Sequence, residues 1–61
     1  MPVSIEIENK TFMGSYHVEG GTMTVWYGAR RRVARTGSPR EKTLARILLL
    51  EMVEADLAES G

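Results

Sequence analysis

Apolar and polar residues alternate on both sides of the Gly20-Gly21 pair, and this alternation constrains the fold more than any other feature. The apolar positions are Phe12, Tyr16 and Val18 before the pair and Met23, Val25 and Tyr27 after it. A period of two is typical of a strand with one buried face, and two glycines between such runs predict a tight hairpin. Closing the chain at this pair places Val18 opposite Met23. Tyr16 then lies opposite Val25, so the large apolar side chains share one face.

The N-terminal segment shows the same alternation at Val3, Ile5 and Ile7. Asn9-Lys10 is a suitable two-residue turn because Asn tolerates a positive φ angle. A hairpin closed there pairs Ile7 with Phe12 and Ile5 with Gly14. Gly14 therefore falls on the apolar face, where the missing side chain would allow another element to approach closely.

Gly28 predicts a further turn or a bulge. If residues 28–30 form a three-residue loop, Val33 pairs with Val25 and Arg32 lies across from Trp26. Residues 31–36 then form a short basic strand at the edge of the sheet, where arginines discourage the addition of further strands. The alternative is a third strand that continues past Gly28, and we favour four strands.

Residues 38–41, Ser-Pro-Arg-Glu, form a capping box with proline at the first helical position. We expect the substitution Ser38→Ala to cost about 1 kcal/mol. The following residues carry apolar side chains at the spacing of an amphipathic helix. The core stripe is Leu44, Ala45, Leu48, Leu49, Met52 and Val53.

The sequence thus predicts a single α+β domain over residues 1–61. An antiparallel meander of three to four strands, at about 2–8, 11–19, 22–27 and 31–36, packs on one helix at about 39–59. The chain has 61 residues and no cysteine, so no disulfide can compensate for a small core.

The predicted helix has two features that break local rules, and such violations often mark an interface. Ile47, Leu50 and Leu57 form a second apolar seam, interrupted at Glu54. The charges also oppose the helix dipole, with cations first and anions last. Net charge is −2 over residues 1–29, +6 over residues 30–46 and −4 over residues 47–61. Two such helices packed antiparallel would place unlike charges opposite each other, which predicts a homodimer.

A cluster of arginines beside an exposed aromatic residue predicts an alternative function, the binding of nucleic acid or another polyanion. The cluster comprises Arg30, Arg31, Arg32, Arg35 and Arg40, with Trp26 as a stacking platform. The other interpretation of Trp26 is a cation–π pair with Arg32 across the strands. A net charge of zero is unusual for a dedicated nucleic-acid domain.

The sequence offers no catalytic constellation, so we expect the protein not to be an enzyme. His17 is the one histidine and has no partner at metal-ligand or triad spacing. We therefore expect no metal, no cofactor and no small-molecule substrate. The longest apolar run, residues 47–50, is far shorter than a membrane span. The first residues lack the layout of a signal peptide, so we expect a cytoplasmic protein and no membrane partner.

Several turns, the predicted cap and some core positions resemble those of short proteobacterial proteins of unknown function, of the kind found in Burkholderia and its relatives. The similar segments are residues 14–16, 18–21, 27–28, 37–39 and 44–46. The resemblance covers most of the chain and implies a bacterial origin and a shared scaffold. It implies no activity.

Overall fold

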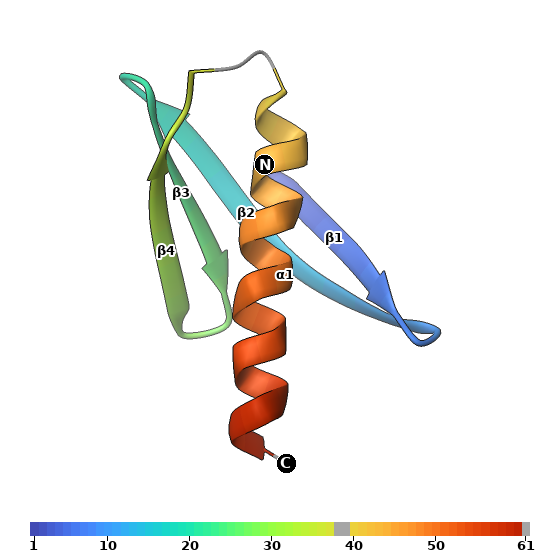
Figure 1. Ribbon diagram of the computed structural model, residues 1–61. Helices are drawn as coiled ribbons and strands as arrows, with labels where there is room; N and C mark the ends of the chain where they lie inside the picture. Colours follow the sequence, from blue (N-terminus) through green and yellow to red (C-terminus); the bar gives the residue numbers. More distant parts are fainter. Residues whose placement is uncertain (38–39, 61) are drawn as a thin grey trace.

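The computed structural model describes residues 1–37 and 40–60 and shows a four-stranded antiparallel sheet with one helix across it (Figure 1). The elements are β1 (Pro2–Ile7), β2 (Lys10–Glu19), β3 (Thr22–Tyr27), β4 (Arg30–Arg35) and α1 (Glu41–Ser60). The strands lie in the order of the chain, β1-β2-β3-β4. The predicted α+β meander on a C-terminal helix is therefore confirmed, with four strands.

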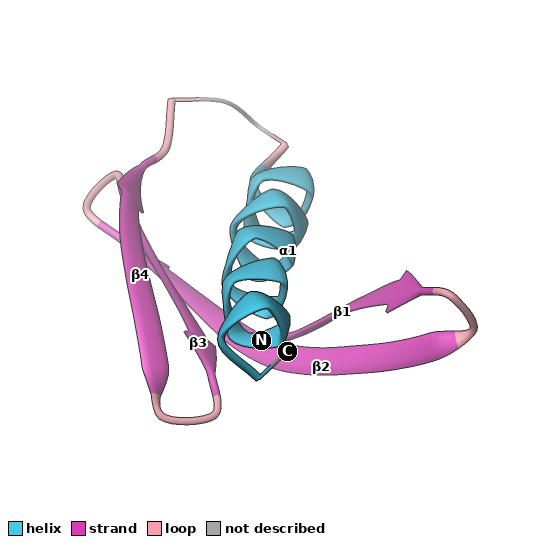
Figure 2. Ribbon diagram, turned by 60° about the horizontal axis from the view of Figure 1, so that its bottom comes forward, coloured by secondary structure: helices cyan, strands magenta, loops and turns pink. Residues whose placement is uncertain are grey.

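The helix packs on one face of the sheet and lies between the β1–β2 hairpin and the β3–β4 hairpin (Figure 2). The backbone N–H of Leu44 donates to the carbonyl of Arg40 at 3.2 Å, which closes the first turn of the helix. The predicted capping box rests on Ser38 and Pro39, which lie outside the described residues.

The central hairpin has the predicted register. Val18 lies opposite Met23 and Tyr16 lies opposite Val25. Gly20 and Gly21 adopt φ angles of +57° and +76°. Two successive positive φ angles match the right-handed twist of the flanking strands, and glycine adopts them without steric cost.

The predicted register of the first hairpin is wrong by two residues. The turn is Glu8–Asn9, with φ angles of +49° and +68°, so Ile5 pairs with Phe12 and Val3 pairs with Gly14. A shift of two residues keeps every side chain on its predicted face, so the hydrophobic pattern alone could not exclude it. The observed register brings the chain terminus into the ladder. The Met1 amino group donates to the Tyr16 carbonyl at 2.9 Å, and the Tyr16 N–H donates to the Met1 carbonyl at 2.8 Å.

The predicted three-residue loop after β3 is also wrong. Gly28 and Ala29 form a two-residue turn, Gly28 has a φ angle of +59°, and Trp26 lies opposite Arg31. Val33 pairs with Thr24, not with Val25. A one-residue shift exchanges the two faces of β4. Arg30, Arg32 and Ala34 consequently share the helix side of the sheet, while Arg31, Val33 and Arg35 share the outer side.

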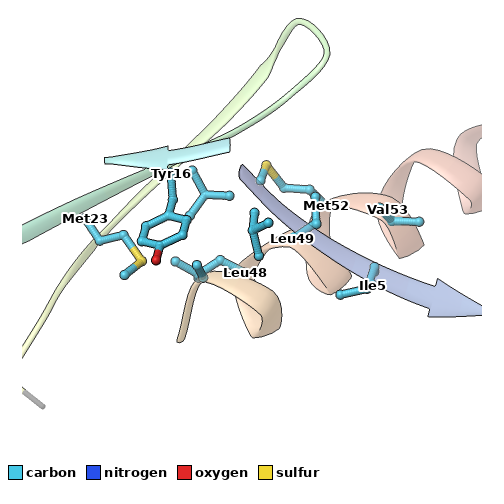
Figure 3. Close-up of a cluster of buried hydrophobic side chains, with 10 residues drawn as sticks. Ile5, Tyr16, Met23, Leu48, Leu49, Met52 and Val53 are labelled. Carbon is cyan, nitrogen blue, oxygen red and sulfur yellow. The ribbon is translucent and has the colours of Figure 1, made fainter. Parts of the chain in front are cut away.

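The core lies between α1 and the helix side of the sheet (Figure 3). Its buried residues are Val3, Ile5, Tyr16, Met23, Val25, Ala45, Leu48, Leu49, Met52 and Val53. Five of the six predicted helix positions are buried and Leu44 is half-buried, so the predicted stripe is confirmed. Gly14 permits a close approach, as predicted. A Cβ atom at this position would lie 2.5 Å from the Trp26 carbonyl oxygen and 3.0 Å from Leu49 Cδ1.

Candidate interaction surfaces

The basic strand and the acidic end of the helix are paired within the chain. Arg30 forms ion pairs with Asp56, at 3.6 Å, and with Glu59. Arg32 Nη1 donates to Glu51 Oε1 at 2.8 Å. All five side chains are partly exposed, and an exposed ion pair contributes only about 0–1 kcal/mol. The main consequence of these pairs is that the side chains of Arg30 and Arg32 lie against the acidic residues of α1.

These pairs divide the predicted arginine cluster between two surfaces. Arg30 and Arg32 face the helix acids, whereas Arg31 and Arg35 lie on the outer side of β4. Arg40 directly precedes α1 and belongs to neither strand face. The structure therefore does not bring the five arginines together as one anion site. The predicted cation–π partner of Trp26 also changes, because Arg31 and not Arg32 is its cross-strand neighbour.

The second apolar seam of the helix is exposed, as the sequence predicts. Ile47, Leu50 and Leu57 have exposed fractions of 49%, 36% and 46%. Glu54 fills the gap in this line between Leu50 and Leu57, and Thr43 extends it before Ile47. We define the helix seam as Thr43, Ile47, Leu50, Glu54 and Leu57. Their separations of four, three, four and three residues are those of a coiled-coil contact line.

A hollow of about 320 Å³ borders the helix seam on the side of β1. It is lined by Ile5, Glu6, Thr43, Arg46, Ile47 and Leu50. A second hollow of about 450 Å³ continues along β1 and shares Arg46 with the first. The exposed Ile47 and Leu50 therefore lie at the edge of an open recess between α1 and β1.

The outer side of the sheet carries a second group of exposed apolar residues. Trp26, Val33 and Met13 have exposed fractions of 38%, 56% and 67%. Within the described residues, α1 is the one helix, and it packs on the opposite face. Sequence reasoning missed Val33 here because it assigned a three-residue loop. The alternative of a two-residue turn at Gly28-Ala29 would have placed Val33 beside Trp26.

Among residues 1–37 and 40–60, no group of three or more His, Asp or Glu side chains could hold a metal ion. The same ranges contain no helix whose length and apolarity would carry it across a bilayer. Comparison of the chain with protein-family models, curated proteins and solved structures finds no match.

Proposed function

We propose that the protein is a small self-associating domain whose two copies pack their helices antiparallel along the helix seam. The observation that carries this proposal is the exposed line of Ile47, Leu50 and Leu57, bordered by the hollow beside β1. Exposed apolar lines of this kind are typical of protein–protein contacts.

Part of the seam, together with Arg46 at its border, is complementary to itself when the helix is reversed about Leu50. Arg46 and Glu54 lie four residues on either side of Leu50, and Thr43 and Leu57 lie seven residues on either side. In an antiparallel pair centred on Leu50, Arg46 of each copy faces Glu54 of the other. The acidic interruption of the seam then becomes a cross-helix charge pair, which favours one orientation of the partner.

The ion pairs within the chain reduce the number of charged side chains that can pair with a second copy. Glu51, Asp56 and Glu59 are engaged by β4, so they do not serve as the partner's acidic surface. Glu54 and Arg46 have no ion pair within the described residues. This pair replaces the broader contact between basic and acidic halves that the sequence predicts.

The exposed seam supports a weak dimer. The exposed fractions of 49%, 36% and 46% amount to about 1.3 fully exposed side chains per copy. Burying them on both copies would contribute about 4–8 kcal/mol. Association itself costs an estimated 4–15 kcal/mol. With up to about 2 kcal/mol from two charge pairs, the sum favours association only when that cost is near its lower limit, and then by at most about 6 kcal/mol, so we expect a Kd no tighter than about 0.04 mM.

Sedimentation equilibrium from about 10 µM to about 1 mM tests this expectation. The wild-type chain should approach the mass of two copies as concentration rises, and Leu50→Glu should remain a monomer. Val33→Glu makes the same kind of change at an exposed position on the outer face of the sheet and should leave the equilibrium unchanged. A wild-type chain that stays monomeric throughout would refute the proposal.

A charge reversal tests the orientation of the pair. Arg46→Glu and Glu54→Arg should each weaken association, since each places like charges in contact across the interface. The double variant restores both cross-helix pairs with the charges exchanged and should recover the wild-type Kd. Circular dichroism of each variant distinguishes loss of the helix from loss of the contact. A double variant weaker than both single variants would exclude the antiparallel pair.

A further inference from the structure

The outer face of β3 and β4 combines an aromatic side chain with cations that form no ion pair within residues 1–37 and 40–60. Trp26 lies directly opposite Arg31, and the side chains of Val33 and Arg35 follow on the same face of β4. Neither β3 nor β4 contains an acidic residue. Arg31 and Arg35 have no ion pair within the described residues, in contrast to Arg30 and Arg32 on the helix side.

We infer that this outer face binds single-stranded nucleic acid, with Trp26 stacking on a base and with Arg31 and Arg35 contacting phosphates. Open sheets with exposed aromatic residues bind single strands in this way, because unpaired bases present their flat faces. Bases in a duplex are already stacked on each other, so Trp26 would gain no such contact there.

The spacing of the two arginines suits an extended strand. They lie four residues apart on β4, which is about 13 Å at the rise of a β-strand. Over that distance they would reach different phosphates of one strand while Trp26, beside Arg31, holds a base. Ser15 continues the row on the other side of Trp26 and offers a hydroxyl group at the edge of the stacking position.

This site is independent of the proposed dimer because it lies on the opposite side of the sheet from α1. A dimer formed through the helix seam would carry two such faces, and each would remain accessible. Binding by the monomeric Leu50→Glu variant therefore distinguishes the two proposals, since the outer face should bind whether or not the copies associate.

Trp26 is the one tryptophan of the chain, so its fluorescence reports on this site directly. The probe is an oligothymidine of about 12 nucleotides, within the length that small single-strand-binding modules cover. At an ionic strength near 0.01 M, where the Debye length is about 30 Å, we expect added oligothymidine to quench the Trp26 fluorescence until the site is saturated. With two phosphate contacts, log K should fall with log salt at a slope of about −1.4. A duplex of equal length should bind more weakly.

Variants on the two sides of β4 give the decisive comparison, measured by anisotropy of a labelled oligothymidine. Arg31→Ala should weaken binding several-fold and reduce the salt slope by about 0.7. Arg32→Ala changes the adjacent arginine on the opposite face and should leave the affinity within about twofold. Trp26→Leu should weaken binding by roughly 5- to 150-fold, the equivalent of about 1–3 kcal/mol of stacking. Absence of quenching, equal losses from Arg31→Ala and Arg32→Ala, or duplex binding as tight as single-strand binding would overturn the inference.

Discussion

Gly14 is the position where one added methyl group should disturb the fold most. An alanine Cβ would lie 2.5 Å from the Trp26 carbonyl oxygen and 3.0 Å from Leu49 Cδ1. The first contact is with backbone of the neighbouring strand, so β2 and β3 must separate or the helix must move outward. Such overpacking typically costs about 1–3 kcal/mol. For a domain of this size each kcal/mol corresponds to about 4–8 °C in Tm, so Gly14→Ala should lower Tm by about 4–24 °C.

Gly37→Ala is the matched control for this substitution. Among the described residues, apart from Gly37 itself and its chain neighbours, no atom lies within 4 Å of a Cβ at Gly37, and its φ angle lies outside the left-handed region. We expect its Tm to stay unchanged or to rise, because alanine restricts the unfolded chain by about 0.4–1 kcal/mol. Both variants are melted at one protein concentration and followed by circular dichroism, which holds any contribution of dimerisation fixed. If Gly14→Ala lowered the free energy of unfolding by less than about 0.5 kcal/mol, the close packing of β2 beneath Leu49 would be refuted.

Two further substitutions test the turns and the ion pairs. Glu8→Asn should raise the free energy of unfolding by about 0.5–1 kcal/mol, because Asn tolerates the positive φ angle better than Glu. Lys10→Asn should not raise the free energy of unfolding, because Lys10 lies in β2 and not in the turn. If Lys10→Asn stabilised the fold and Glu8→Asn did not, the turn would lie at residues 9–10. A double-mutant cycle of Arg32→Ala and Glu51→Ala should give a coupling of about 0.2–1 kcal/mol that decreases in high salt. A coupling insensitive to salt would contradict a solvent-exposed pair.

The identity of the elements could be predicted because strand and helix periods differ clearly in this sequence. Alternation on both sides of Gly20-Gly21 is compatible with registers two residues apart, and the glycine pair selects the one that closes in a two-residue turn, which the structure has. The helix stripe follows from the same kind of pattern, and its exposed seam was predicted because those residues fall outside the stripe.

The register errors have different physical causes. In the first hairpin, registers two residues apart bury the same side chains, so the choice depends on turn conformation and on the hydrogen bonds between Met1 and Tyr16. After β3, the pattern itself gives little guidance, since the next residues are three successive arginines. Their assignment to faces follows from the two-residue turn at Gly28-Ala29, and Arg30 and Arg32 then meet acids of α1 that lie at least nineteen positions further along the chain.

The pairing of Arg30 and Arg32 with the helix explains why the charge layout that opposes the helix dipole is tolerated. An acid near the C-terminus of a helix lowers the free energy of unfolding by about 0.3–1 kcal/mol, and an exposed ion pair raises it by about the same amount. Of the three paired acids, Glu59 lies in the last turn of α1, and its pairing with Arg30 offsets this cost locally. Arg46 and Glu54 on one surface, and Arg31 and Arg35 on another, have no such compensation within the described residues. These four charges lie on the same surfaces as exposed Leu50 and exposed Trp26, where binding energy from apolar contact is also available.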